Sequence, residues 1–291
     1  MDLRRLGHFL AVVDHGGFTA ASKAVLISQP ALSLAVKELE AELGTELFAR
    51  IGRRALLTPA GEALVGPARQ VLRDIETGRA AVLAVAGLET GRLSLASLPT
   101  LAADPLADLV GRFRRCYSGV QIDLAAPEGT TEIMDLIANG ACEIGVIEAH
   151  EVPTNLVIHA LGTQDLVLIF PPGDASRSSS VALVDLEEIA FVAAPPGTST
   201  RRLLDEGFAA VGRLPRIAVI AAQRDAILPL VLSGAAAALV PQSIGNVARQ
   251  LGATLVRPVP SIQRQVALAH RAGSLAPAAA RFVELALESR A

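Results

Sequence analysis

Residues 18–43 constrain the fold of this chain more than any other segment. Residues 18–25 form a short alanine-rich stretch that favours a helix, and the pair 26–27 follows as a turn. Ser28 suits the N-cap of a second helix, and Pro30 fits its first turn, where a missing N–H costs nothing. Apolar side chains in that helix share one face at helical spacing: Leu32, Val36, Leu39 and Leu43. The segment therefore predicts a helix-turn-helix.

Flanking patterns extend this motif to a small domain over residues 1–58. An earlier helix is predicted by apolar residues at helical spacing: Leu3, Leu6, Phe9, Leu10 and Val13. Gly16-Gly17 ends that helix, and Gly44 ends the helix that begins after Ser28. Residues 46–58 then predict a hairpin, or wing, with Gly52-Arg53-Arg54 at its tip.

A helix-turn-helix places the N-terminal end of its second helix in the DNA major groove. Glutamine can pair with adenine edges, and lysine with guanine or phosphate. The candidate DNA-contacting residues are Thr19, Ser28, Gln29, Pro30, Ser33, Leu34, Lys37, Arg50, Arg53 and Arg54. Residues 1–58 hold seven Lys/Arg and six Asp/Glu, a net charge near +1, so this hypothesis depends on the motif rather than on bulk charge. The alternative is a three-helix packing unit that binds no DNA.

Residues 59–87 predict one long helix. Its apolar residues step by four and three in turn, which is coiled-coil spacing: Leu64, Ala68, Val71, Ile75, Gly78, Val82 and Val85. We expect this helix to pair with a second copy of the chain. The alternative is a helix that packs only on its own domain.

From Gly91 onward the pattern changes to alternating strands and helices, which is typical of an α/β fold with parallel sheets. Helices are expected at 103–115, 131–138 and 277–289. The expected strands are 93–98, 120–125, 143–147, 156–161, 166–170, 191–193, 217–220, 237–240 and 266–270. About 200 residues suit two small lobes.

The segment FTAASKAVLISQPALSLAVKELEAELGTELFARIGRRALLTPAGEAL resembles the DNA-binding signature of LysR-type transcriptional regulators. The matching features include Phe18-Thr19, residues 28–33, Leu43-Gly44, Arg50 and Gly61. Weaker family-like features follow at 197–199 and in Val231, Gly234, Leu239 and Pro241.

The resemblance implies a winged helix-turn-helix at 1–58, a linker and dimerisation helix at 59–90, and an effector-binding domain at 91–291. That domain would be similar to type 2 periplasmic-binding proteins, with lobe I at about 91–162 and 267–291 and lobe II at about 163–266. The implied partners are double-stranded promoter DNA, a small-molecule effector, further copies in a dimer or a tetramer of two dimers, and RNA polymerase.

Ligands in open α/β sheets lie beyond the carboxyl ends of strands, near helix N-termini. Three such segments yield the candidate effector contacts Ser97, Pro99, Thr100, Gly129, Thr130, Gly197, Thr198, Ser199, Arg201 and Gln223. Free N–H groups and the positive ends of helices favour a small anion such as a carboxylate. The alternative for each Ser or Thr is a simple helix cap.

The chain departs from the family pattern at Leu34, where members usually carry a polar or basic residue. A leucine cannot donate to a base, although it can contact a thymine methyl. We therefore expect fewer direct base contacts from this helix, with more of the specificity in the wing or in DNA shape.

Other function classes lack their motifs. The five histidines lie apart, no G-x-S-x-G nucleophile elbow occurs, and no Cys/His cluster or phosphate loop suggests a metal or cofactor. We predict no enzyme activity, no metal and no cofactor. The alternatives are a small-molecule-binding protein with weak or no specific DNA binding, and redox sensing through Cys116 and Cys142. The charged N-terminus lacks an apolar signal region and no apolar run could span a membrane, so we expect a cytoplasmic protein.

Overall fold

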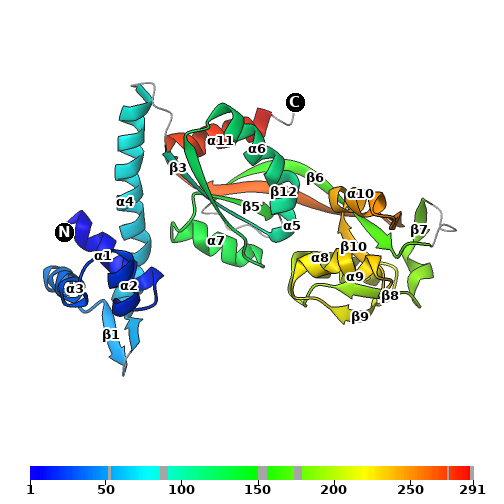
Figure 1. Ribbon diagram of the computed structural model, residues 1–291, viewed down its shortest axis with the longest axis horizontal. Coiled ribbons are helices and arrows are strands. Elements are labelled where there is room, and N and C mark those ends of the chain that lie inside the picture. The colour runs from blue at the N-terminus through cyan, green and yellow to red at the C-terminus, as the bar shows by residue number, and fades with distance from the viewer. Residues whose placement is uncertain (52–53, 86–90, 150–155, 174–178, 274, 289–291) are drawn as a thin grey trace.

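The computed structural model describes residues 1–51, 54–85, 91–149, 156–173, 179–273 and 275–288. The N-terminal head contains three helices and an antiparallel hairpin: α1 (Leu3–Asp14), α2 (Phe18–Ala24), α3 (Gln29–Leu43), β1 (Phe48–Ile51) and β2 (Arg54–Leu57). Figure 1 shows the hairpin projecting from this head.

The predicted helix signals of the head are confirmed. Ser28 caps α3, since its Oγ accepts from the Ala31 N–H at 3.3 Å, and Gly44 ends α3 in the left-handed conformation with φ 70°. Leu26 turns the chain between α2 and α3 with a positive φ of 56°. The predicted apolar face of α3 is buried except at its last member, because Leu43 lies at the helix end and is 40% exposed.

A single helix, α4 (Pro59–Val85), follows the hairpin and stands beside the head in Figure 1. The first half of its apolar seam packs on the chain's own head, as the alternative interpretation expected. Ala68 is buried in the core of the head, and Leu64 and Val71 pack against the same core. Further along, Ile75 is 43% and Val82 70% exposed. The first half therefore belongs to the head, whereas the second half leaves apolar side chains uncovered.

The rest of the described chain is organised around a curled mixed sheet. Its strands lie in the order β4 (Val120–Ala125), β3 (Gly91–Ser97), β5 (Ile144–Glu148), β12 (Ile262–Arg271), β6 (Leu156–Phe170), β11 (Thr254–Val259) and β7 (Ser180–Ala182). Strand β10 (Ala238–Pro241) also pairs with β6, and β8 (Ala190–Ala193) pairs with β9 (Arg216–Ile220). Only part of the expectation of parallel sheets is correct. β3 runs parallel to β4 and β5, but β12 is antiparallel to both β5 and β6.

The two separate strands expected at 156–161 and 166–170 are one 15-residue strand, β6. It pairs with β12 from Leu156 to Leu166, with an irregularity where Gly162 faces Val266, and its last residues pair with β10 and β11. The polar residues between the two apolar runs hid this continuity. β12 likewise begins at Ile262, four residues before its expected start. These two strands join lobe I to lobe II, and β7 and β11 were not predicted.

Helices cover the sheet in both lobes. In lobe I they are α5 (Pro99–Leu101), η1 (Ala102–Leu106), α6 (Ala107–Cys116), α7 (Thr130–Ala138) and α11 (Pro277–Glu288). Lobe II carries η2 (Leu183–Leu186), α8 (Ser199–Ala209), η3 (Arg224–Ala226), α9 (Ile227–Leu232) and α10 (Gln242–Gln250). The continuous helix expected at 103–115 is wrong. Asp104 is extended (φ −161°, ψ 119°) because a residue before proline is disfavoured in the helical region.

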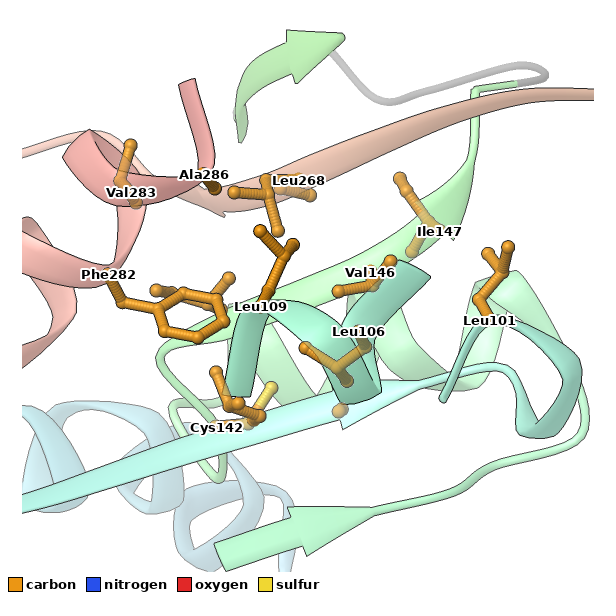
Figure 2. Packing of buried hydrophobic residues seen from close by; sticks show 14 of the residues in the cluster. Leu101, Leu106, Leu109, Cys142, Val146, Ile147, Leu268, Phe282, Val283 and Ala286 are labelled. Carbon is orange, nitrogen blue, oxygen red and sulfur yellow. The ribbon is translucent and has the colours of Figure 1, made fainter. Parts of the chain in front are cut away.

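Each lobe has its own apolar core. Figure 2 shows the core of lobe I, where Leu106 and Cys142 pack among residues from the other end of the chain, including Phe282 and Val283. The core of lobe II contains Phe170, Phe191, Phe208 and Val256 among others. The sheet therefore carries two separately packed units connected by β6 and β12.

Candidate nucleic-acid interface and interlobe site

Helix α3 has one face in the core of the head and the opposite face in solvent. Ser28, Gln29, Pro30 and Lys37 are exposed, and Leu34 is 58% exposed. Ser33 is half-buried beside them. The N-terminal end of α3 and this face thus form one continuous surface.

The start of α2 joins this surface. Thr19 is exposed, and its Oγ1 lies 3.4 Å from the Gln29 Oε1. On the wing, the backbone of Arg50 lies opposite Ala55, and that of Arg54 opposite Ile51, in the antiparallel hairpin. The third predicted wing arginine, Arg53, lies outside the described residues.

The acidic groups of α3 have partners within the head, although Glu38 and Glu42 are exposed. Glu38 forms an ion pair with Arg5 at 2.8 Å, and Glu40 accepts from the backbone N–H of Leu47 at 2.8 Å and of Phe48 at 3.2 Å. Glu42 pairs with Arg5 and with the N-terminal ammonium, which lowers the pKa of its carboxyl. The low net charge of the head therefore does not reflect the charge on the exposed face of α3, where Lys37 lies.

The first predicted effector segment contains Ser97, Pro99 and Thr100 and lies at the end of β3, next to lobe II. Ser97 is fully buried and donates to the carbonyl of Leu98 at 3.0 Å, so its hydroxyl is used locally. Pro99 begins α5, and the Thr100 Oγ1 accepts from the Nη2 of Arg264 at 2.8 Å. Thr100 thus contacts a strand that belongs to both lobes.

The second segment precedes α7, where Gly129 is the N-cap residue and Thr130 the first helical residue. Immediately before them, Glu128 of lobe I forms an ion pair with Arg224 of lobe II, with Arg224 Nε 3.1 Å from the carboxylate. Gln223, another predicted contact, is exposed and caps η3 next to Arg224. These two predicted sites therefore face each other across the lobes.

The third segment begins α8 in lobe II. Gly197 has a φ of +87°, which favours glycine, and the buried Thr198 donates to the Pro195 carbonyl at 2.8 Å. The Ser199 hydroxyl donates to Glu148 of lobe I at 2.6 Å. Arg201 instead pairs with Asp205 of its own helix, at 2.9 Å.

Arg264 on β12 lies at the centre of this region and was not among the predicted residues. It is 2% exposed, and its guanidinium donates to Gln164 Oε1 at 2.8 Å, to Ser199 Oγ at 3.2 Å and to Thr100. Burial lowers its pKa to about 10, while the nearby Glu148 carboxylate opposes that shift. Burial alternates over the first five residues of β12, where Ile262, Arg264 and Val266 are buried, so this alternation was the available signal.

Glu148 at the end of β5 was also missed. Its carboxylate is 6% exposed and binds both Ser199 and Arg202 of α8. Gln164 completes the group, since its Nε2 donates to the backbone carbonyl of Asp104 at 2.7 Å. The structure therefore brings Thr100, Ser199, Arg264, Glu148 and Gln164 into one buried polar network between the lobes.

The cysteines do not form a pair. Cys116 is exposed, while Cys142 is buried in the lobe I core, where burial raises the pKa of its thiol to about 12. A thiolate is the reactive form, so Cys142 is poorly suited to sensing oxidants. Among the residues described, no group of three or more His, Cys, Asp or Glu could hold a metal ion. In the same part of the chain, no helix has both the length and the apolar character needed to cross a bilayer.

Two family models match the chain. The model described as bacterial regulatory helix-turn-helix protein, lysR family, matches residues 3–62, and the LysR substrate binding domain matches residues 86–291. A probable RuBisCO transcriptional regulator of Cyanophora paradoxa is 30% identical over 86% of this chain and 78% of its own. A RuBisCO operon transcriptional regulator of Allochromatium vinosum is 28% identical over 100% of this chain and 97% of its own.

Solved structures give the same result. The full-length regulator CbnR in complex with its target DNA superposes with a TM-score of 0.72 at 26% identity, over 99% of this chain and 100% of that chain. A full-length OxyR variant from Pseudomonas aeruginosa superposes with a TM-score of 0.75 over 100% of this chain and 94% of its own; its 20% identity supports the fold alone. These relatives are transcriptional regulators rather than enzymes. This chain therefore belongs to the LysR family of bacterial transcriptional regulators, with a helix-turn-helix domain followed by an effector-binding domain.

Proposed function

We propose that this regulator recognises a promoter site through the exposed face of α3 and the wing, and that a small anion bound between the lobes controls it. The domain division would be 1–58 for DNA, 59–90 for dimerisation and 91–291 for the effector, in a cytoplasmic protein. The observation that carries the DNA part is the exposed surface of Ser28, Gln29, Leu34 and Lys37 opposite a fully packed helix face. The regulator CbnR, similar over its whole length, has been solved with its target DNA.

A second copy of the chain fits the same proposal. The C-terminal half of α4 exposes Ile75 and Val82 at coiled-coil spacing, and paired helices would cover them. Two heads held in this way would bind the two halves of a pseudo-palindromic site.

Binding to the intergenic DNA upstream of the chain's own gene tests the DNA part. Fluorescence anisotropy would compare that DNA with a scrambled duplex across a salt series. We expect selective binding that weakens with salt, because Lys and Arg displace counterions from phosphates. Gln29→Ala should reduce the preference for the specific duplex, whereas Lys37→Ala should weaken binding to both duplexes alike.

Leu34 needs its own comparison, because its side chain offers only an apolar contact to a base. Leu34→Ala should lower the specific affinity about fivefold or more if the leucine contacts a thymine methyl. Leu214→Ala is the matched control, since Leu214 is a 79% exposed leucine in lobe II. Equal selectivity in wild type and Leu34→Ala would place specificity in the wing or in DNA shape. Absence of selectivity at every salt concentration would leave the protein as a small-molecule-binding module.

The proposal that an anionic effector binds between the lobes depends on Arg264. A buried charge is normally paired with an opposite charge, yet the hydrogen bonds of Arg264 go to uncharged oxygens of Gln164, Ser199 and Thr100. The nearby Glu148 carboxylate is held by Ser199 and Arg202. An effector carboxylate beside Thr100 and Ser199 would place a negative charge in direct contact with the Arg264 guanidinium, whereas the Nε of Arg201 is already paired with Asp205.

Thermal shift with a panel of small carboxylates and their matched neutral amides tests this ligand class. We expect stabilisation by a subset of the acids, because a ligand that binds only the folded state raises the unfolding temperature. Arg264→Lys should weaken that response, whereas Arg257→Lys should leave it unchanged, because Arg257 is an exposed arginine on β11, which is separated from β12 by β6. Stabilisation by the amides but not the acids would contradict an anionic effector.

A further inference from the structure

Helix α4 is attached to lobe I of the same chain through two arginines one helical turn apart. Arg69 donates to Asn139 Oδ1 at 3.2 Å, and Arg73 donates to the backbone carbonyl of Gly140. Asn139 is the C-cap residue of α7, and Gly140 follows it. Both acceptors lie at the C-terminal end of α7, where the negative end of the helix dipole favours cationic side chains.

The same contact reaches the DNA-binding head. Arg69 also forms an ion pair with Asp14, the last residue of α1. Its side chain is only 17% exposed, although Asp14 is half exposed. One guanidinium therefore connects a helix of the head, the linker helix and the end of α7.

The Arg73 guanidinium occupies the space where a side chain at position 140 would begin, so a Cβ there would have to displace it. Gly140 has a φ of +71°, a conformation that side chains disfavour, and a Cβ there would overlap the Arg73 guanidinium. Burial against lobe I lowers the pKa of Arg73 to about 10, so the group still carries its charge at neutral pH. The contact is therefore a close-packed one rather than a loose surface ion pair.

The other end of α7 lies at the interlobe site. Its N-cap Gly129 directly follows Glu128, which Arg224 of lobe II binds. Between the two ends, Ile133 and Ile137 are fully buried in the lobe I core. A nine-residue helix spans about 14 Å at 1.5 Å per residue. Figure 1 shows α7 on the side of lobe I that faces α4.

We infer that Arg69 and Arg73 are positioning residues that fix the DNA-binding head on lobe I. Through α7 they couple DNA binding to the interlobe pair of Glu128 and Arg224. This inference depends on the proposed DNA binding by the head. Because coupling between two sites is reciprocal, DNA bound at the head must change the affinity of the interlobe site for an effector by the same factor as the effector changes DNA affinity, and we expect this coupling to alter the interlobe pair even without an effector. No effector is needed to test it.

Hydrogen exchange of the full-length protein, with and without its upstream DNA, measures this coupling. In wild type, DNA should change the exchange rate of amides 128–131 and of residues around Arg224 by about fivefold or more. The change should disappear in the double variant Arg69→Met/Arg73→Met. Arg79→Met is the control, because Arg79 is an exposed arginine on the same helix. Asp14→Asn, a milder change at a half-exposed residue, should give an intermediate loss.

Anisotropy on the same samples separates the two proposals. If DNA binds and the exchange rates change equally in wild type and the double variant, or do not change in wild type, the coupling is disproved while DNA binding stands. If no DNA binds, the proposed function fails.

A DNA-free measurement then decides the positioning role. Spin labels on the native exposed Cys116 and on Glu46→Cys report the distance between lobe I and the head, with labelled chains diluted into unlabelled ones. The labelled Glu46→Cys protein, alone or with Arg79→Met, should give one narrow distance distribution. The labelled protein that also carries Arg69→Met/Arg73→Met should give a broad one. Equal widths would overturn the inference.

Discussion

The carboxylate of Glu148 accepts a 2.6 Å hydrogen bond from the hydroxyl of Ser199, which ties the end of β5 in lobe I to the start of α8 in lobe II. Glu148 also forms an ion pair with Arg202 of α8. The other interlobe ion pair, Glu128 with Arg224, differs from it mainly in the exposure of the glutamate: the Glu148 side chain is 8% and the Glu128 side chain 56% exposed. This difference in exposure predicts different energies for two pairs of the same chemistry.

Replacing each glutamate by alanine should separate the two pairs. Glu148→Ala should cost about 2–4 kcal/mol, because it leaves Arg202 and Ser199 without their buried acceptor. Glu128→Ala should cost less than about 1 kcal/mol, as is usual for exposed ion pairs. Urea unfolding followed by circular dichroism measures both. Equal losses would mean that burial does not set the strength of the interlobe contacts.

Two glycines of α4 should respond in opposite directions to alanine. A Cβ at Gly61 would lie 2.2 Å from the carbonyl oxygen of Leu47, so Gly61→Ala should destabilise the head by about 2–3 kcal/mol or more. Gly78 has no atom of its own chain within 4 Å of the same position, so Gly78→Ala should stabilise the unpaired helix by about 0.5–1 kcal/mol, whereas a second copy packed on this seam would oppose that gain. Thermal unfolding of the two variants beside wild type provides the measurement. Destabilisation by Gly78→Ala would show that this site is covered in solution.

Stability should fall in mildly acidic solution because of His159. Its Nε2 lies 3.0 Å from the Nε2 of His270, and burial together with His270 lowers its pKa below 6.5. As the pH falls, His159 takes up a proton in the unfolded chain at a higher pH than in the folded protein. Its contribution to the free energy of unfolding is therefore complete above about pH 6.5 and decreases as the pH falls through the lowered pKa. Unfolding temperatures from about pH 7.5 to about pH 5.5 should decline more steeply for wild type than for His159→Gln. Parallel declines would assign the effect to other groups.

The two thiols should differ in reactivity. A thiol-specific disulfide reagent should modify Cys116 rapidly in the folded protein, whereas Cys142 should react only on unfolding, since its pKa is raised to about 12. Cys116→Ser should therefore abolish the fast phase. Rapid reaction of two thiols in the native state would reopen the hypothesis of redox sensing.

Local signals predicted the head well, because its helices carry their own caps and stops. Ser28 and Gly44 act within a few residues of their own positions, so the sequence alone revealed them. β6 and Arg264 could not be found in this way. The polar middle of β6 interrupts its apolar pattern, and Arg264 is stabilised by partners about 100 and 164 residues away in the chain. Such groups become visible only when the fold brings distant segments together.

The two connecting strands also impose an order on synthesis. Lobe II completes its core with Ile262, while lobe I still lacks Phe282, Val283 and Ala286 at that point. Chains fold as they leave the ribosome, N-terminal units first. Lobe I, although it begins earlier in the chain, therefore finishes last, and a chain truncated after residue 265 would contain the whole core of lobe II but only part of the core of lobe I.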